Sequence, residues 1–124
     1  MTSQLRSVPF RASILAENDA GDSLASGDAQ EVFPLASVTK LFTAYSALIA
    51  IFRGLVTLSA PAPYPGVTLE HLLSHASGMT IGERSMTRPP GTRRIYSNAG
   101  IEAAADMLEE ATGTEIGRWI EETI

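Results

Sequence analysis

The chain has 124 residues, of which 44% are hydrophobic and 19% charged, a balance that indicates one globular domain rather than a disordered or fibrous protein. Its 14 acidic and 9 basic residues give a net charge of −5, which argues against a nucleic acid as the main partner. Because cysteine is absent, disulfides and Cys-ligated metal sites are excluded.

The sequence shows neither a targeting segment nor a membrane span. Residues 1–10 contain one Arg and no apolar run of the kind that marks a signal peptide. The longest apolar stretch, Leu41–Phe52, is shorter than the roughly 20 residues that a transmembrane helix needs. We therefore expect a soluble, cytoplasmic protein with no membrane partner.

Residues 1–36 predict strands and turns. Ala12–Ala16 and Ser23–Ser26 are the candidate strands, and the segment between them is rich in turn-forming residues, so we expect a β-hairpin. The proline in Glu31–Leu35 predicts an extended approach to the next element rather than a central strand.

The next part of the chain predicts a buried helix and a short one. Ser37–Arg53 is apolar almost all round, which indicates a buried helix with Ser37 as its N-cap or first-turn residue and Gly54 at its end. Three prolines make residues 59–66 a loop. A short helix is then expected over Thr68–His75.

After a second loop at residues 84–92, helical spacing returns over Asn98–Ala111, and a last helix is expected from Thr114. Trp119 falls outside the line of Ile116, Ile120 and Ile124, so we expect it at the flank of this helix or at a contact surface. The chain stops on Ile124, an apolar residue inside this pattern, and offers only two or three strands. We therefore expect a partial domain that pairs with, or continues into, further chain.

Lys40 is the only lysine, since the other eight basic residues are Arg. A lysine buried in an apolar helix has a lowered pKa and can act as a base, which Arg cannot. Ser37 precedes it by three positions, so the two side chains share a helix face and can form an activated nucleophile. In the simpler interpretation, Ser37 is only an N-cap and Lys40 extends its amine to solvent.

Tyr96 and Asn98 lie two residues apart, just ahead of a helix, where an extended backbone points both side chains to one side. They can line one cleft, or Tyr96 can be a half-buried wall and Asn98 an N-cap.

Three other groups favour structural roles. His71 and His75 stand at i and i+4 but lack the Glu of the zinc-protease motif and a third ligand, so we expect no metal; His75 is expected to bond the backbone. Four arginines in one loop and four acids at helical spacing are expected in solvent. The arginines are Arg84, Arg88, Arg93 and Arg94, and the acids are Glu102, Asp106, Glu109 and Glu110.

Three segments carry a family resemblance: FPLASVTKLFTAYSALI at 33–49, TLEHLLSHASGM at 68–79 and PPGTRRIYSNAG at 89–100. In this order they resemble the serine β-lactamase-like family of class C β-lactamases, D-Ala-D-Ala carboxypeptidases and esterase relatives. The resemblance implies an α+β fold of the β-lactamase/transpeptidase type, an antiparallel sheet flanked by helices. Residues 1–124 would form part of one such domain, with strands in 1–36 and the nucleophile helix and helical lobe in 37–124.

The resemblance also implies the site. Ser37 would be the acylated nucleophile, Lys40 its base partner, Tyr96 the proton relay and Asn98 a hydrogen-bond partner for the substrate amide. The family's third motif, Lys-Thr-Gly or His-x-Gly on a strand that supplies one oxyanion donor, has no counterpart here. Losing one such donor costs about 2.7–4 kcal/mol of catalysis.

The expected function is therefore that of a serine hydrolase that acts through an acyl-enzyme on a small ester, amide or β-lactam, with a tilt toward esters. No cofactor is expected. The alternatives are a non-catalytic or penicillin-binding-like relative, or a fragment that needs a complementary C-terminal chain or associates with itself through exposed apolar faces.

Overall fold

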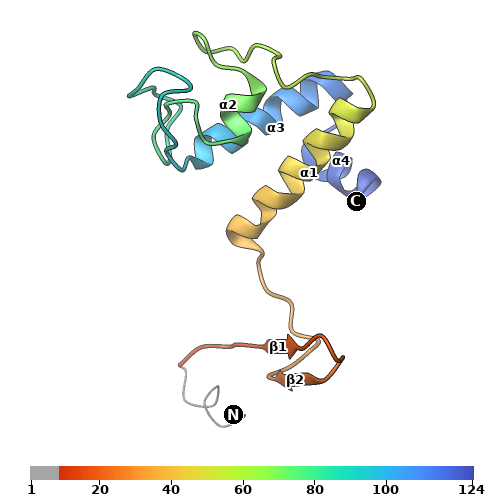
Figure 1. Ribbon diagram of the computed structural model, residues 1–124. Helices are drawn as coiled ribbons and strands as arrows, with labels where there is room; N and C mark the ends of the chain where they lie inside the picture. The colour runs from red at the N-terminus through yellow and green to blue at the C-terminus, as the bar shows by residue number, and fades with distance from the viewer. Residues whose placement is uncertain (1–8) are drawn as a thin grey trace. The chain divides into compact units, whose positions relative to one another are not determined.

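The computed structural model describes residues 9–124 (Figure 1). The chain forms two compact units, one that ends at Leu35 and one that spans Ala36–Ile124. The strands belong to the first unit and the helices to the second.

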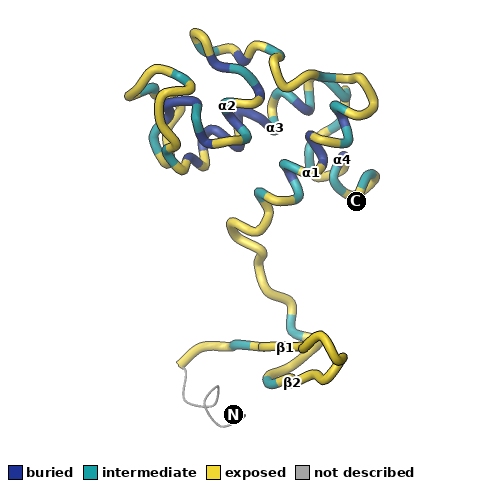
Figure 2. The backbone as a smooth tube through the Cα atoms, viewed as in Figure 1, coloured by how far each residue is buried: buried dark blue, intermediate teal, exposed yellow. Residues whose placement is uncertain are grey.

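The first unit contains the predicted β-hairpin. Its strands, β1 (Ile14–Glu17) and β2 (Ser23–Ser26), pair antiparallel with Ile14 opposite Ser26. The turn between them is held by the Asn18 side chain, whose Oδ1 accepts the N–H groups of Ala20 and Asp22 at 3.0 and 2.9 Å. Figure 2 shows that both strands are almost wholly exposed within their unit, so pairing rather than burial defines them. Residues 31–35 carry no regular structure, as the proline predicts.

The second unit begins with a 3₁₀ turn, η2 (Ala36–Val38), that leads into α1 (Thr39–Phe52). Ser37 therefore lies in the turn before α1. The N-cap of α1 is Val38, which makes no side-chain cap, so the N-cap prediction for Ser37 is wrong and its hydroxyl is free for other partners. Gly54, with φ +73°, ends the helix as predicted.

Only one face of α1 is buried, so the prediction of a helix buried all round is wrong for this chain. Thr43, Ser46, Ala47 and Ala50 face the interior. Four large apolar residues spaced by one turn instead form an exposed stripe, with Phe52 at 93% exposure; we call Leu41, Tyr45, Leu48 and Phe52 the exposed α1 stripe.

The helix predicted over 68–75 is present but shorter, as α2 (Leu69–Leu73). Thr68 is its N-cap, and the ring of His71 reaches back to accept the Thr68 N–H at Nδ1, 3.2 Å away. The helix ends early because Ser74 is the C-cap and His75 takes a left-handed backbone conformation, with φ +59°.

The loop between α2 and α3 folds back on Gly78. At φ +83°, a Cβ on this residue would lie 2.0 Å from the Arg88 carbonyl oxygen, so only glycine fits. Thr87 donates its N–H to the Gly78 carbonyl at 2.8 Å, which closes the loop.

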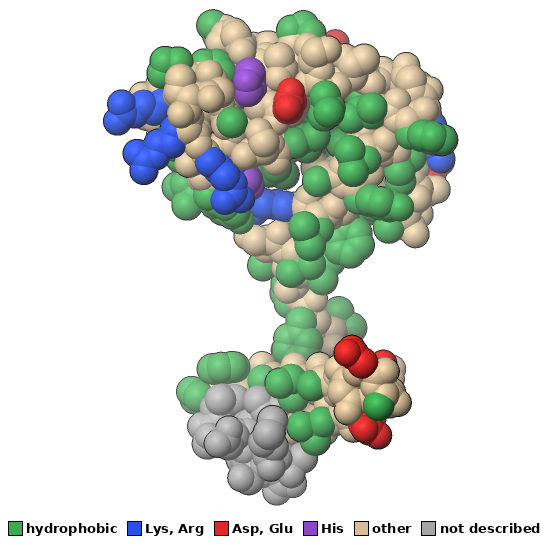
Figure 3. Space-filling model, in the orientation of Figure 1, with side chains coloured by type: hydrophobic (Ala, Val, Ile, Leu, Met, Phe, Trp, Pro, Cys, Tyr) green, Lys and Arg blue, Asp and Glu red, His purple; other side chains and the backbone are tan. Residues whose placement is uncertain are grey.

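Figure 3 shows basic side chains gathered over this part of the unit. All four arginines of the sequence cluster are exposed, and Arg84 pairs with Asp106 at 2.6 Å.

The last two helices are α3 (Asn98–Thr112) and α4 (Ile116–Thr123). Ser97 is the N-cap of α3 and Gly113, in the left-handed region, its C-cap. Glu115 caps α4 by accepting the Arg118 N–H at 3.0 Å, so this helix starts two residues later than predicted. Glu102, Asp106 and Glu110 are exposed as predicted, but Glu109 is half-buried and accepts the Ile116 N–H at 2.9 Å.

Two clusters of buried side chains hold this unit together. One joins α2 to α3 through Leu69, Leu72 and Ala104; the other joins α1, α3 and α4 through Ala47, Leu108 and Trp119. Of the two positions predicted for Trp119, a flank or a contact surface, the structure shows the contact surface: the residue is only 6% exposed, and its Nε1–H donates to the Ser46 carbonyl of α1 at 3.2 Å. None of the helices within residues 9–124 combines the length and apolarity that crossing a bilayer requires.

Candidate active site

The hydroxyl of Ser37 is the meeting point of two other polar side chains. The Lys40 Nζ donates to Ser37 Oγ at 3.1 Å, and the Tyr96 phenol donates to the same oxygen at 2.8 Å. Three of the predicted site residues thus come together, although Tyr96 lies 59 positions from Ser37 in the chain. The Ser37–Lys40 contact follows from their spacing, because residues i and i+3 share one face over the first helical turn.

Lys40 is only partly buried, so the expectation of a fully buried lysine does not hold for this chain. Its ammonium lies 5.2 Å from the centre of the Tyr96 ring, within the range of a cation–π interaction. Lys40 therefore contacts both the nucleophile and the phenol.

Tyr96 is held on the edge of the unit, with 41% of its surface exposed. The hydrogen bond to Ser37, followed by the hydrogen bond and charge of Lys40, lowers the pKa of Tyr96 from its ordinary value of 10.0. Both effects favour the phenolate, so the surroundings of Tyr96 prepare it to accept a proton.

Ser97 supports Tyr96 from the adjacent position. Its buried hydroxyl accepts the Gly100 N–H at 2.9 Å and donates to the Thr80 carbonyl at 2.6 Å, which joins the start of α3 to the preceding loop. Sequence reasoning passed over Ser97. The available signal was a serine directly before a helical pattern, which is the usual N-cap position.

Asn98 is the first residue of α3 rather than its cap. Its backbone N–H donates to the Ile81 carbonyl at 2.7 Å, and its side chain reaches the same pocket as Ser37 and Lys40. The structure therefore places Ser37, Lys40 and Asn98 around one pocket, with Asn98 exposed; Tyr96 bonds Ser37 but is not among the residues that line this pocket.

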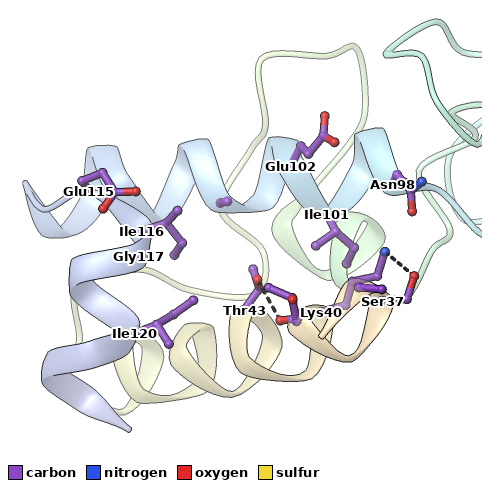
Figure 4. Close-up of a pocket in the computed structure, with 13 residues that line it drawn as sticks. Ser37, Lys40, Thr43, Asn98, Ile101, Glu102, Glu115, Ile116, Gly117 and Ile120 are labelled. Carbon is purple, nitrogen blue, oxygen red and sulfur yellow. Dashed lines mark hydrogen bonds between the residues drawn. The ribbon is translucent and has the colours of Figure 1, made fainter. Parts of the chain in front are cut away.

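The pocket beside Ser37 has a volume of about 500 Å³ and lies between α1, α3 and the start of α4 (Figure 4). Ser37, Lys40 and Asn98 stand at one end, and Ile116 and Ile120 at the other. Its wall is mainly apolar, with the reactive hydroxyl at the polar end. Such a pocket suits a small organic molecule whose polar group faces Ser37.

Each histidine uses Nδ1 to accept a backbone N–H, His71 from Thr68 and His75 from Ser97, both at 3.2 Å. The ring of His75 thus bonds the backbone, as predicted, but its partner is Ser97 rather than the Ser77–Gly78 turn that the sequence suggested. Within residues 9–124, no group of three or more His, Asp or Glu side chains is arranged to hold a metal ion.

Known proteins share both the sequence pattern and the fold. A crystal structure of a β-lactamase from Mycobacterium bovis is 40% identical and superposes with a TM-score of 0.85, over 97% of this chain and 44% of that protein. The chain thus has the predicted β-lactamase fold as a partial domain and spans less than half the length of this relative. A search of curated proteins gives no match. Residues 17–124 match the Beta-lactamase family model, and the chain therefore belongs to the β-lactamase family.

Proposed function

We propose that the chain carries the nucleophilic half of a serine hydrolase that acts through an acyl-enzyme. The single observation behind this proposal is the pair of hydrogen bonds to Ser37 Oγ, from Lys40 at 3.1 Å and from Tyr96 at 2.8 Å. Family membership supports hydrolase chemistry in general, and these contacts supply a nucleophile together with two groups, either of which can take its proton once it has itself lost one.

In the proposed acylation step, Ser37 Oγ forms a bond to the carbonyl carbon of the substrate. Its proton passes to the Tyr96–Lys40 pair, which returns it to the leaving group as the carbonyl–leaving group bond breaks. Water then attacks the carbonyl carbon of the acyl-enzyme and gives a proton to the same pair, which passes it to Ser37 Oγ as the bond between the acyl carbon and Ser37 Oγ breaks and the carboxylic acid leaves. Asn98 would orient the substrate through its amide.

We further propose that turnover needs a complementary C-terminal segment. The sequence has no counterpart of the motif whose strand supplies the second oxyanion donor, and loss of one donor costs about a hundredfold to a thousandfold in rate. The exposed α1 stripe is the surface that such a segment would cover, because large apolar side chains gathered along one helix face favour burial. The alternative occupant is a second copy of the chain.

The substrate is proposed to be a small ester, with an amide or a β-lactam as the alternatives. The apolar wall of the pocket favours an acyl group without charge. A second candidate function, a penicillin-binding-like protein that is acylated without turnover, is favoured by the missing third motif. The cytoplasmic location stays a prediction, which cell fractionation checks.

The test is the intact mass of the protein before and after incubation with an activated acyl ester. We expect a mass gain of one acyl group on the wild type and none on Ser37→Ala. Ser85→Ala is the matched control, because Ser85 is also exposed but its hydroxyl bonds only Glu83 among the described contacts. Equal labelling of Ser37→Ala and the wild type would contradict the proposal, and lasting label without release would favour the penicillin-binding-like function.

A further inference from the structure

His75 contacts the segment that carries Tyr96 at three points. Its backbone carbonyl accepts the N–H of Ile95 at 2.8 Å, and its Nδ1 accepts the N–H of Ser97 at 3.2 Å. These two donors flank Tyr96 on either side. Between them, the imidazole packs on the phenol ring, with centroids 4.8 Å apart and planes inclined by 36°. His75 therefore contacts the tyrosine and both of its neighbours in the chain.

The contact at Nδ1 requires a neutral ring. An imidazole nitrogen that accepts an N–H cannot carry a proton itself, so the proton of His75 must be on Nε2. Protonation of Nδ1 would place two N–H groups against each other and break the bond to Ser97. The imidazole is buried, with 8% exposure, so water cannot readily replace the lost partner.

The charges that face His75 oppose its protonation. Lys40 from α1 and Arg94 from the segment before α3 are both cationic, and Tyr96 is the titratable group in direct contact. Burial, then the positive charges of Arg94 and Lys40, lower the pKa of His75 from its ordinary value of 6.5. The folded protein thus keeps this ring neutral at neutral pH.

We propose that His75 is a positioning residue that, as the neutral Nε2–H imidazole, holds the Tyr96 phenol in hydrogen-bond range of Ser37. The expected effect of His75 on the acylation rate rests on the proposed function. Its expected effect on the position and pKa of Tyr96 does not. His75 touches neither Ser37 nor the pocket in the described contacts, so it acts through Tyr96 alone.

The test is His75→Asn. Asparagine tolerates the left-handed backbone, and its Oδ1 can replace Nδ1 as the acceptor for Ser97, so this variant removes the ring while keeping the local backbone bonds. We expect the rate of acylation by an activated ester to fall by about 10- to 100-fold, because a misplacement of about 1 Å has an effect of this size, with KM changed less than twofold.

His71→Asn is the matched control, because His71 also accepts a backbone N–H at Nδ1 but lies against Thr68 in the cap of α2. We expect it to leave the acylation rate within about twofold of wild type, since Thr68 is not in the site. Equal losses in His71→Asn and His75→Asn would show a general structural effect and overturn the proposal.

A second readout does not depend on activity. Ultraviolet titration follows the ionisation of the three tyrosines. Subtracting the titration curve of Tyr96→Phe from that of the parent protein leaves the signal of Tyr96 and gives its pKa. In His75→Asn this pKa should move back toward 10.0, because the contacts with Ser37 and Lys40 that lower it are weakened. An unchanged pKa of Tyr96 in His75→Asn would overturn the proposed role of His75, whether or not the wild type is acylated. Failure of the wild type to be acylated would overturn only the proposed function.

The pH profile supplies the last discriminating result. The wild-type acylation rate should fall in acid, with a midpoint below 6.5, as His75 gains a proton and releases Ser97. Stability should be lost in the same direction, because the unfolded chain binds this proton more readily than the folded one. His75→Asn should lack this acidic limb; if it keeps the limb unchanged, His75 is not the group responsible.

Discussion

The first turn of α1 adjoins Ser37, and the second half of α1 packs against α4. Different interactions hold these two regions together. In the turn that leads into α1, Ser37 is exposed, and its partners Lys40 and Tyr96 are only partly covered. In the second half of the helix, Ala47 and Ala50 are fully buried against Leu108 and Trp119. Hydrogen bonds between polar side chains organise the first region, and apolar packing organises the second.

This difference separates chemistry from stability along one helix. Exposed polar groups that meet by hydrogen bonding contribute little to folding, since water can replace their partners. Buried apolar side chains contribute most of the free energy of folding but have no reactive groups. Substitutions at the two ends of α1 should therefore change different observables.

Ser37→Ala should have the largest effect. We expect acylation to fall by up to about a millionfold, because Ser37 Oγ is the proposed nucleophile. The free energy of unfolding should stay within about 0.5 kcal/mol of wild type, because the side chain is exposed. Intact mass and urea denaturation measure the two effects; a large loss of stability would break the separation.

Lys40→Arg should come next. The charge is kept, but a guanidinium cannot take a proton at any pH of interest, so acylation should fall by about 100- to 10,000-fold. Stopped-flow kinetics with an activated ester measures the rate. A fully reactive variant would show that Lys40 acts only through its charge and would leave Tyr96 as the base.

Trp119→Ala should lower the stability of the fold and leave the acylation rate unchanged. Removing a buried indole that also donates to the Ser46 carbonyl should cost about 3–5 kcal/mol of folding free energy. The midpoint of unfolding, followed by circular dichroism, measures this loss. Where the variant remains folded at low temperature, its acylation rate should match wild type, since Trp119 is not among the pocket-lining residues.

The alkaline pH dependence should sharpen the assignment of Tyr96. Because its pKa is lowered, the phenolate forms below the ordinary value of 10.0, and the acylation rate should rise with pH through that lower midpoint. Since the folded chain releases this proton more readily than the unfolded one, stability should rise in the same window. Tyr96→Phe should abolish both rises.

Phe52→Ser should have the smallest effect on the isolated chain. The side chain is 93% exposed on the exposed α1 stripe, so the free energy of unfolding should change by no more than about 0.5 kcal/mol. Analytical ultracentrifugation adds a second measurement: weaker self-association in this variant would indicate that a second copy covers the stripe. Unchanged association would exclude that occupant and leave the complementary segment.

Local features were predictable because their causes lie within a few residues. The hairpin turn, the glycine that ends α1 and the Ser37–Lys40 contact each depend on one turn of backbone. The observed helix ends differ by a few residues from the predicted ones. Side-chain caps set these ends, as Thr68 does for α2 and Glu115 for α4. The burial of α1 was overestimated because apolar composition does not show which face finds a partner.

By itself, the sequence determined the pairing of Ser37 with Lys40 and, through family resemblance, pointed to Tyr96 and Asn98 as further candidate site residues. Only the tertiary structure decided that Tyr96 reaches Ser37, that His75 and Ser97 hold it there, and that Trp119 is buried against α1. The physical reason is separation in the chain: these contacts join residues 22 to 73 positions apart. Such pairings depend on how whole helices pack, which no local spacing specifies.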